Sequence, residues 1–146
     1  MGEHSIVFGG RDYGDDCAAL IRAAFDAAGL SLPGDVRDAA ALHAFAERSG
    51  ALKRGAPRAG DLVFLADVPG GRAAHVGLVS RVDPDGTALV LHRVSRGVLP
   101  LRVNVAWPEH AADPATGKRV NDSLVVGGEH VPAAKLVVAR AELLRG

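Results

Sequence analysis

The chain contains one cysteine, Cys17, and two histidines on strand-like segments far downstream. Cys17 stands where a glycine-rich loop is predicted to lead into a helix, and the unpaired N–H groups and dipole of a first helical turn favour a thiolate. His75 opens one apolar run and His92 closes the next. A cysteine that meets histidines in space is the arrangement of a thiol nucleophile and its base. These residue types therefore predict covalent catalysis, whereas a buried, inert thiol is the alternative.

The two histidines meet only if the hairpin that carries them closes in a particular register. A turn centred on the Pro-Asp step of the Asp-Pro-Asp-Gly segment pairs Val82 with Thr87 and Gly77 with His92. Side chains alternate along a strand, so His75 and His92 would then be diagonal neighbours on one face, about 7–8 Å apart. A three-residue loop would turn His92 to the opposite face. We predict the first register.

Apolar spacing and turn residues indicate which elements position these residues. Helices are predicted over residues 17–28, 35–49 and 133–144, and strands over residues 61–65, 75–82, 87–94 and 97–103. Asp35 is the predicted cap of the second helix, and Val137 and Val138 would also suit a strand. Helices followed by strands, without alternation, predict an α+β fold. We expect one domain over residues 1–146.

Composition excludes several classes of protein. The 146 residues carry 17 basic and 17 acidic side chains, and a neutral chain lacks the basic stripe of a nucleic-acid-binding protein. The sequence has no apolar run of about 18 residues, so we predict no membrane span. Its first residues have neither a basic nor an apolar segment, so no signal peptide is predicted.

A metal site is a competing interpretation of the same side chains. Cys17, His75 and His92 would supply three ligands, but no second cysteine or closely spaced histidine accompanies them. We therefore predict no metal. The remaining histidines are read as structural or solvated: His4, His43, His110 and His130.

Several short motifs stand in the order found in the NlpC/p60 and CHAP-type papain-like cell-wall hydrolases, which this chain resembles from residue 8 to about 103. The matching segments are Phe8-Gly9-Gly10, Asp16-Cys17-Ala18-Ala19, Pro57-Arg58-Ala59-Gly60-Asp61-Leu62-Val63, His75-Val76-Gly77-Leu78 and His92. The resemblance implies a papain-like α+β domain, with N-terminal helices packed on an antiparallel β-sheet. Asp61 of the third segment is read as structural, holding its loop by hydrogen bonds.

The resemblance also implies roles for individual residues. Cys17 would be the nucleophile, His75 its base and His92 the third residue, which orients His75. The backbone N–H of Cys17 would stabilise the oxyanion. Asp16 and Tyr13 would have an auxiliary role at the oxyanion site.

Two positions depart from the family pattern. A loop tyrosine often precedes the cysteine in the family, and Ile6 stands at the equivalent place here. Tyr13, the sole tyrosine, either substitutes for it from another loop position or leaves that contribution absent. The residues after Cys17 are Ala18-Ala19 rather than Ser-Gly. Neither change removes a reacting group.

By this resemblance, the protein is expected to be a cysteine hydrolase (endopeptidase or amidase) that cleaves amide bonds in the peptide stem of peptidoglycan. It would need no cofactor, bind peptidoglycan stem peptides and act as a monomer. Its expected location is the periplasm or the outside of the cell, and the cytoplasm is the alternative. Three alternatives use a similar fold: a catalytically impaired cell-wall-binding module, an antibacterial toxin, and a lipid acyltransferase or phospholipase. The last is disfavoured because those lipid-processing enzymes carry the histidine before the cysteine, whereas Cys17 precedes His75 in this chain.

Overall fold

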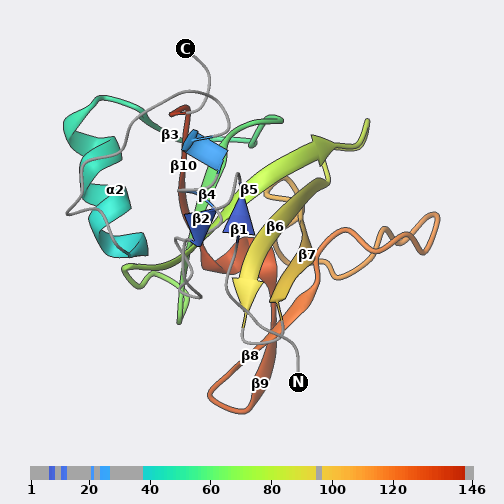
Figure 1. Ribbon diagram of the computed structural model, residues 1–146. Coiled ribbons are helices and arrows are strands. Elements are labelled where there is room, and N and C mark those ends of the chain that lie inside the picture. Colours follow the sequence, from blue (N-terminus) through green and yellow to red (C-terminus); the bar gives the residue numbers. More distant parts are fainter. Residues whose placement is uncertain are drawn as a thin grey trace.

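The computed structural model describes residues 7–8, 11–12, 21, 24–26, 38–94 and 97–143 (Figure 1). Ile21 and residues 24–26 are helical, as predicted for this part of the chain. The rest of the predicted helix over residues 17–28 lies outside the described residues, so its packing on the sheet stays a prediction. Val7–Phe8 (β1) and Arg11–Asp12 (β2) form a short antiparallel pair in the segment predicted to be a glycine-rich loop.

A six-stranded antiparallel sheet is the centre of the fold, in the order β3-β10-β4-β5-β6-β7. Its strands are Leu52–Lys53 (β3), Leu62–Ala66 (β4), Ala73–Val82 (β5), Ala88–Val94 (β6), Gly97–Val103 (β7) and Val137–Ala141 (β10). The four predicted strands correspond to β4, β5, β6 and β7, with small shifts at their ends. Pro100 lies in β7, an edge strand, where a missing N–H is tolerated.

The last predicted helix, over residues 133–144, is wrong. Of its described residues, 133–143, only Ala133–Leu136 (η1) is helical, as a single 3-10 turn, and the chain then enters the sheet as β10. Val137 and Val138 already suited a strand. This segment forms a strand rather than a helix because it pairs with β3 on one side and with β4 on the other.

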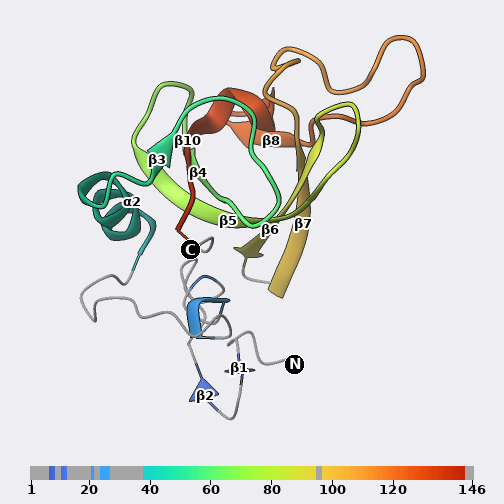
Figure 2. The same cartoon turned by 90° about the horizontal axis from the view of Figure 1, so that it is seen from above.

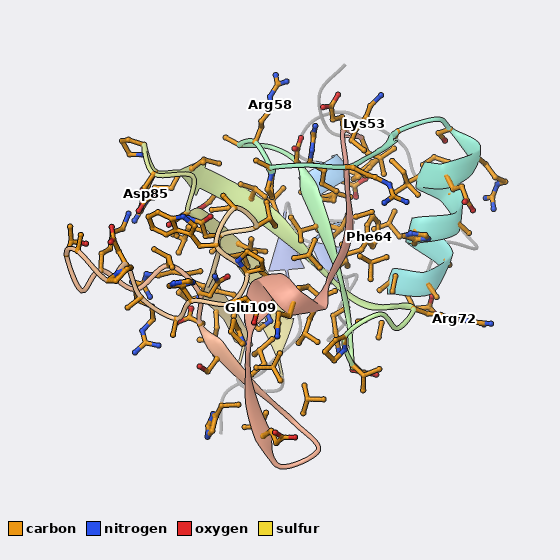
Figure 3. The ribbon with its side chains drawn as sticks, turned by 180° about the vertical axis from the view of Figure 1, so that it is seen from behind. Lys53, Arg58, Phe64, Arg72, Asp85 and Glu109 are labelled. Atoms are coloured by element: carbon orange, nitrogen blue, oxygen red, sulfur yellow. The ribbon has the colours of Figure 1, made fainter. Side chains whose placement is uncertain are left out.

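The helix Ala39–Arg48 (α2) begins later than predicted. Asp38, rather than Asp35, is its N-cap, and the Asp38 side chain accepts a hydrogen bond from the Ala41 N–H at 2.8 Å. One face of α2 is buried against the sheet, where Phe64 points toward the helix (Figure 3). The ring of His43 packs edge-on against Phe64, with centroids 5.1 Å apart, so this histidine is structural as predicted.

Two hydrophobic clusters cover the two faces of the sheet. On the α2 side, Phe64 and Val76 pack with Leu42, Ile21 and Phe25. The sheet curves strongly around its other face, which η1 covers (Figure 2). The cluster on that concave face contains Val63, Leu65, Val79, Val90, Leu101 and Leu136.

A hairpin that the sequence prediction missed stands apart from the main sheet, at the bottom of Figure 1. Its strands are Ser123–Val126 (β8) and Glu129–Pro132 (β9), joined by Gly127 and Gly128. Both glycines have positive φ, 58° and 84°, as a two-residue hairpin turn requires. A Gly-Gly pair between apolar residues was the available signal, in a region for which no helix or strand was predicted.

Asn121 ties this hairpin to the rest of the fold. Its side chain is fully buried, and its Oδ1 accepts hydrogen bonds from the backbone N–H groups of Asn104 at 2.9 Å and Ala134 at 3.1 Å. Its Nδ2 donates to the carbonyl oxygens of Trp107 and His110, both at 2.9 Å. One side chain therefore joins the end of β7, the following loop and the start of η1.

Asp61 has the structural role predicted for it. The fully buried carboxylate accepts from the Arg58 N–H at 2.8 Å, which closes the loop before β4. Its Oδ2 also accepts from Arg140 Nη1 of β10 at 3.0 Å. A buried carboxylate needs such partners, because an uncompensated charge in the interior is strongly unfavourable.

Candidate active site

The register of the β5–β6 hairpin brings the two histidines to one face of the sheet. Gly77 pairs with His92, as predicted, and His75 is therefore the diagonal neighbour of His92. A β-carbon on Gly77 would lie 2.4 Å from Val90 Cγ1 and 2.9 Å from the Leu91 carbonyl oxygen. Only glycine therefore fits between the two histidines without a shift of the strands.

The turn itself differs from the prediction. Val82 pairs with Ala88 rather than with Thr87. Continued along the strands, the Val82–Ala88 register would turn His92 to the opposite face. A bulge at Ser80, between Val79 and Arg81, inserts one residue and restores the predicted pairing further along the strands. The relative position of the histidines therefore depends on this bulge.

His75 makes a short contact with a carboxylate that sequence reasoning missed. Its Nε2 lies 2.7 Å from Oδ1 of Asp67, and the two side chains are 53% and 73% exposed. A carboxylate only accepts hydrogen bonds, so Nε2 carries the proton and the neutral ring keeps its acceptor lone pair on Nδ1. Asp67 follows β4 and precedes His75 by eight residues, but an aspartate at the end of a strand is too common to have been singled out.

His92 is half-buried beside His75. Burial lowers the pKa of His92 below its ordinary value of 6.5, and the electrostatic interaction with His75 lowers it further, partly offset by the carboxylate of Asp122. No hydrogen bond joins His92 to His75 within the described part of the chain. The orienting role expected of His92 stays a prediction.

We expect His92 to remain neutral at pH 7 and to titrate below pH 6.5. In ¹⁵N-edited NMR titrations, a His75→Gln variant should raise the His92 pKa because it removes one of the two causes of the depression. The folded protein releases this proton at lower pH than the unfolded chain, so protonation of His92 should destabilise the fold as the pH falls below 6.5. His43→Gln, on the α2 side, is the matched control. A His92 pKa at or above 6.5 would contradict this environment.

Both histidines line a pocket of about 350 Å³ on the concave side of the sheet. Among the described residues, its polar lining consists of Asp67, His75 and His92. The rest is aliphatic: Leu65, Ala66, Leu101, Leu124, Val125, Val126 and Leu136. The pocket therefore combines an imidazole pair with an apolar wall, which is a common composition for small-ligand sites.

The structure brings together two of the predicted site residues, His75 and His92, and adds Asp67. Cys17, Tyr13 and Asp16 lie outside the described residues, so their roles stay predictions. Over the described ranges, no three His, Cys, Asp or Glu side chains gather in a way that could hold a metal ion. In the same ranges no helix is long and apolar enough to cross a membrane.

The profile of the NlpC/P60 family matches residues 3–110 of the chain. The protein belongs to the NlpC/P60 family. The matched segment contains the predicted nucleophile, both histidines and strands β1 to β7. The β8–β9 hairpin, η1 and β10 of this NlpC/P60 protein lie beyond the match.

A solved structure has a similar fold: an N-acetylmuramoyl-L-alanine amidase from Staphylococcus aureus, with a TM-score of 0.50 and 19% sequence identity. The similarity covers 65% of this NlpC/P60 chain and 28% of the amidase chain. At this identity the likeness concerns the fold alone. No curated protein sequence matches the chain significantly.

Proposed function

We propose that the protein is a cysteine hydrolase that cleaves amide bonds in the peptide stem of bacterial peptidoglycan. The observation that carries this proposal is membership of the NlpC/P60 family, with His75 and His92 lining one pocket. The fold of an N-acetylmuramoyl-L-alanine amidase adds support for a cell-wall amide as substrate.

In the proposed reaction, His75 first takes the proton of the Cys17 thiol, and the resulting thiolate attacks the carbonyl carbon of the scissile amide. The backbone N–H of Cys17 stabilises the oxyanion of the tetrahedral intermediate. His75 then protonates the leaving amine, and the C–N bond breaks to leave a thioester on Cys17. His75 next removes a proton from water, whose oxygen attacks the thioester carbonyl carbon. The C–S bond then breaks, His75 returns the proton to the Cys17 sulfur, and the carboxylic acid leaves.

Asp67 supports this role of His75. The contact of Asp67 with Nε2 leaves Nδ1 as the ring nitrogen that exchanges protons with the reacting groups. His92 would assist in holding the ring, and Tyr13 and Asp16 are auxiliary in the proposal. None of these steps needs a cofactor. Because its substrate is in the cell wall, the protein would work in the periplasm or outside the cell. We propose that it acts as a monomer.

Digestion of purified peptidoglycan, with products identified by mass spectrometry, tests the proposal. We expect soluble peptides or muropeptides with newly exposed amino groups, and no products after alkylation of the protein with iodoacetamide at pH 6. A free amine on the first residue of the stem would identify an amidase, and a cut within the stem an endopeptidase. Binding to peptidoglycan without any product would overturn the hydrolase and favour the binding module.

A further inference from the structure

We propose that the pocket beside His75 and His92 binds an uncharged aliphatic group next to the scissile amide, and that the β8–β9 hairpin selects for it. As a statement about substrates, this rests on the proposed function. As a statement about binding, it rests on the pocket alone. Because the hairpin lies beyond the segment that matches the family, family membership does not supply this wall.

The distribution of side chains around the pocket gives the occupant its chemistry. Aliphatic side chains come from β4, β7, β8 and η1, and β8 contributes three of them: Leu124, Val125 and Val126. Among the lining residues that the structure describes, Asp67 is the one acidic residue and none is a lysine or arginine, and Asp67 already contacts His75. Transferring a charged group to such a wall would be unfavourable. The occupant is therefore neutral and apolar.

Val125 is the side chain that a ligand would cover. It is 67% exposed, the most exposed of the large hydrophobic side chains that the structure describes. Its neighbours Leu124 and Val126 line the same pocket and pack against the concave-face cluster, whereas Val125 alternates with them along β8 and is open to water. Covering this surface with an alkyl group would remove apolar area from water on both partners.

The hairpin is held in place before any ligand arrives. At its base, Asp122 donates its N–H to the Arg102 carbonyl oxygen at 3.0 Å, and its Oδ2 accepts from the Arg102 N–H at 2.7 Å. The Ala133 N–H donates to the Asp122 carbonyl oxygen at 2.8 Å, which closes the other strand of the hairpin. A wall fixed to β7 in this way loses little conformational freedom on binding.

The size of the pocket limits the group. Its volume is about 350 Å³. Each small heavy-atom group needs roughly the 30 Å³ of a water molecule, so there is room for about ten such groups. An amide that carries a butyl or hexyl chain fits this space, whereas a methyl group would leave most of the wall uncovered.

A series of N-alkylacetamides (methyl, butyl and hexyl) probes the pocket directly. Titrations followed by ¹³C-methyl NMR should shift the resonances of Leu124, Val125 and Val126 and leave that of Leu42, on the α2 side, unchanged. Affinity should rise about fourfold for each methylene that becomes buried. N-(6-aminohexyl)acetamide, which carries a charge at the end of the chain, should bind at least tenfold more weakly than the hexyl amide.

Two variants show whether the hairpin makes the wall. Val125→Asp should weaken binding of the hexyl amide at least tenfold, and Val125→Ser covers the case in which the aspartate disturbs the hairpin. Val138→Asp is the matched control, since this valine is also exposed, at 36%, but lies outside the pocket. Equal effects of the Val125 and Val138 changes would overturn the role of the hairpin.

The outcome separates this inference from the proposed function, because binding needs no hydrolysis and is measurable in a Cys17→Ala chain. Affinity that does not depend on chain length, or a preference for the charged amide, would overturn the aliphatic site even if peptidoglycan is cleaved. Chain-length-dependent binding without cleavage of peptidoglycan would support the site and overturn the hydrolase.

Discussion

Cys17→Ala is expected to abolish hydrolysis of peptidoglycan while leaving the protein folded. Removal of the covalent nucleophile of a comparable catalytic triad lowers kcat by on the order of 10⁶, which falls below detection in most cell-wall assays. Alanine is a good helix former, so the change should not disturb the predicted helix. His75→Ala should lower the rate by about 10²–10⁴, the usual contribution of a positioned acid or base.

Initial rates on a soluble muropeptide, with circular dichroism as a check of folding, measure these effects. Retained hydrolysis in folded Cys17→Ala would rule out the thiol mechanism, and a loss of less than about tenfold in His75→Ala would contradict its role as base. The mutation of His43 to glutamine serves as a control because that histidine packs on Phe64, away from the pocket.

The same assay shows which neighbour orients His75. Asn keeps the Oδ1 acceptor at position 67, so Asp67→Asn should retain more activity than Asp67→Ala if this contact matters. His92→Asn or Gln should likewise exceed His92→Ala if His92 accepts from the ring. If the two His92 amide variants lose as much as His92→Ala, His92 does not orient His75.

Asn121→Leu should cause the largest loss of stability among single changes in the segment after β7. The leucine leaves the N–H groups of Asn104 and Ala134, and the carbonyl oxygens of Trp107 and His110, without their present partner. The two N–H groups make buried bonds, and each buried polar group left unsatisfied costs about 1–3 kcal/mol, so the free energy of unfolding should fall by roughly 2 kcal/mol or more. The buried side chain gives water little access to replace these bonds.

Urea unfolding followed by circular dichroism measures this loss. Ser123→Ala, two residues along the chain and exposed, is the control and should change the free energy of unfolding by about 0.5 kcal/mol or less. Asn121→Asp is a second test, because a carboxylate still accepts from the two N–H groups but has no donor for the carbonyl oxygens. A loss of less than about 1 kcal/mol in both variants would mean that the Asn121 hydrogen bonds do not hold this segment.

Sequence patterns predicted the parts of the structure that depend on neighbouring residues. Apolar runs bounded by Gly, Pro and Asp located β4 to β7, and the motif residues indicated the family that the profile match confirms. The Gly-Asp-Leu-Val segment also led to the prediction that Asp61 holds its loop by hydrogen bonds, and its carboxylate does accept from the Arg58 N–H. The nucleophile and its oxyanion site were inferred in the same way and stay predictions.

Only the tertiary structure decided the features that depend on residues far apart in the sequence. Val137–Ala141 becomes a strand because a place between β3 and β4 is open to it. His75 and His92 share a face because a bulge at Ser80 compensates for a longer turn, and one residue of register reverses every side chain beyond it. Asp67 reaches His75, and the β8–β9 hairpin reaches the pocket, through contacts that no local propensity records. Backbone pairing and burial are satisfied over the whole sheet at once, so local sequence limits the choices and long-range packing selects among them.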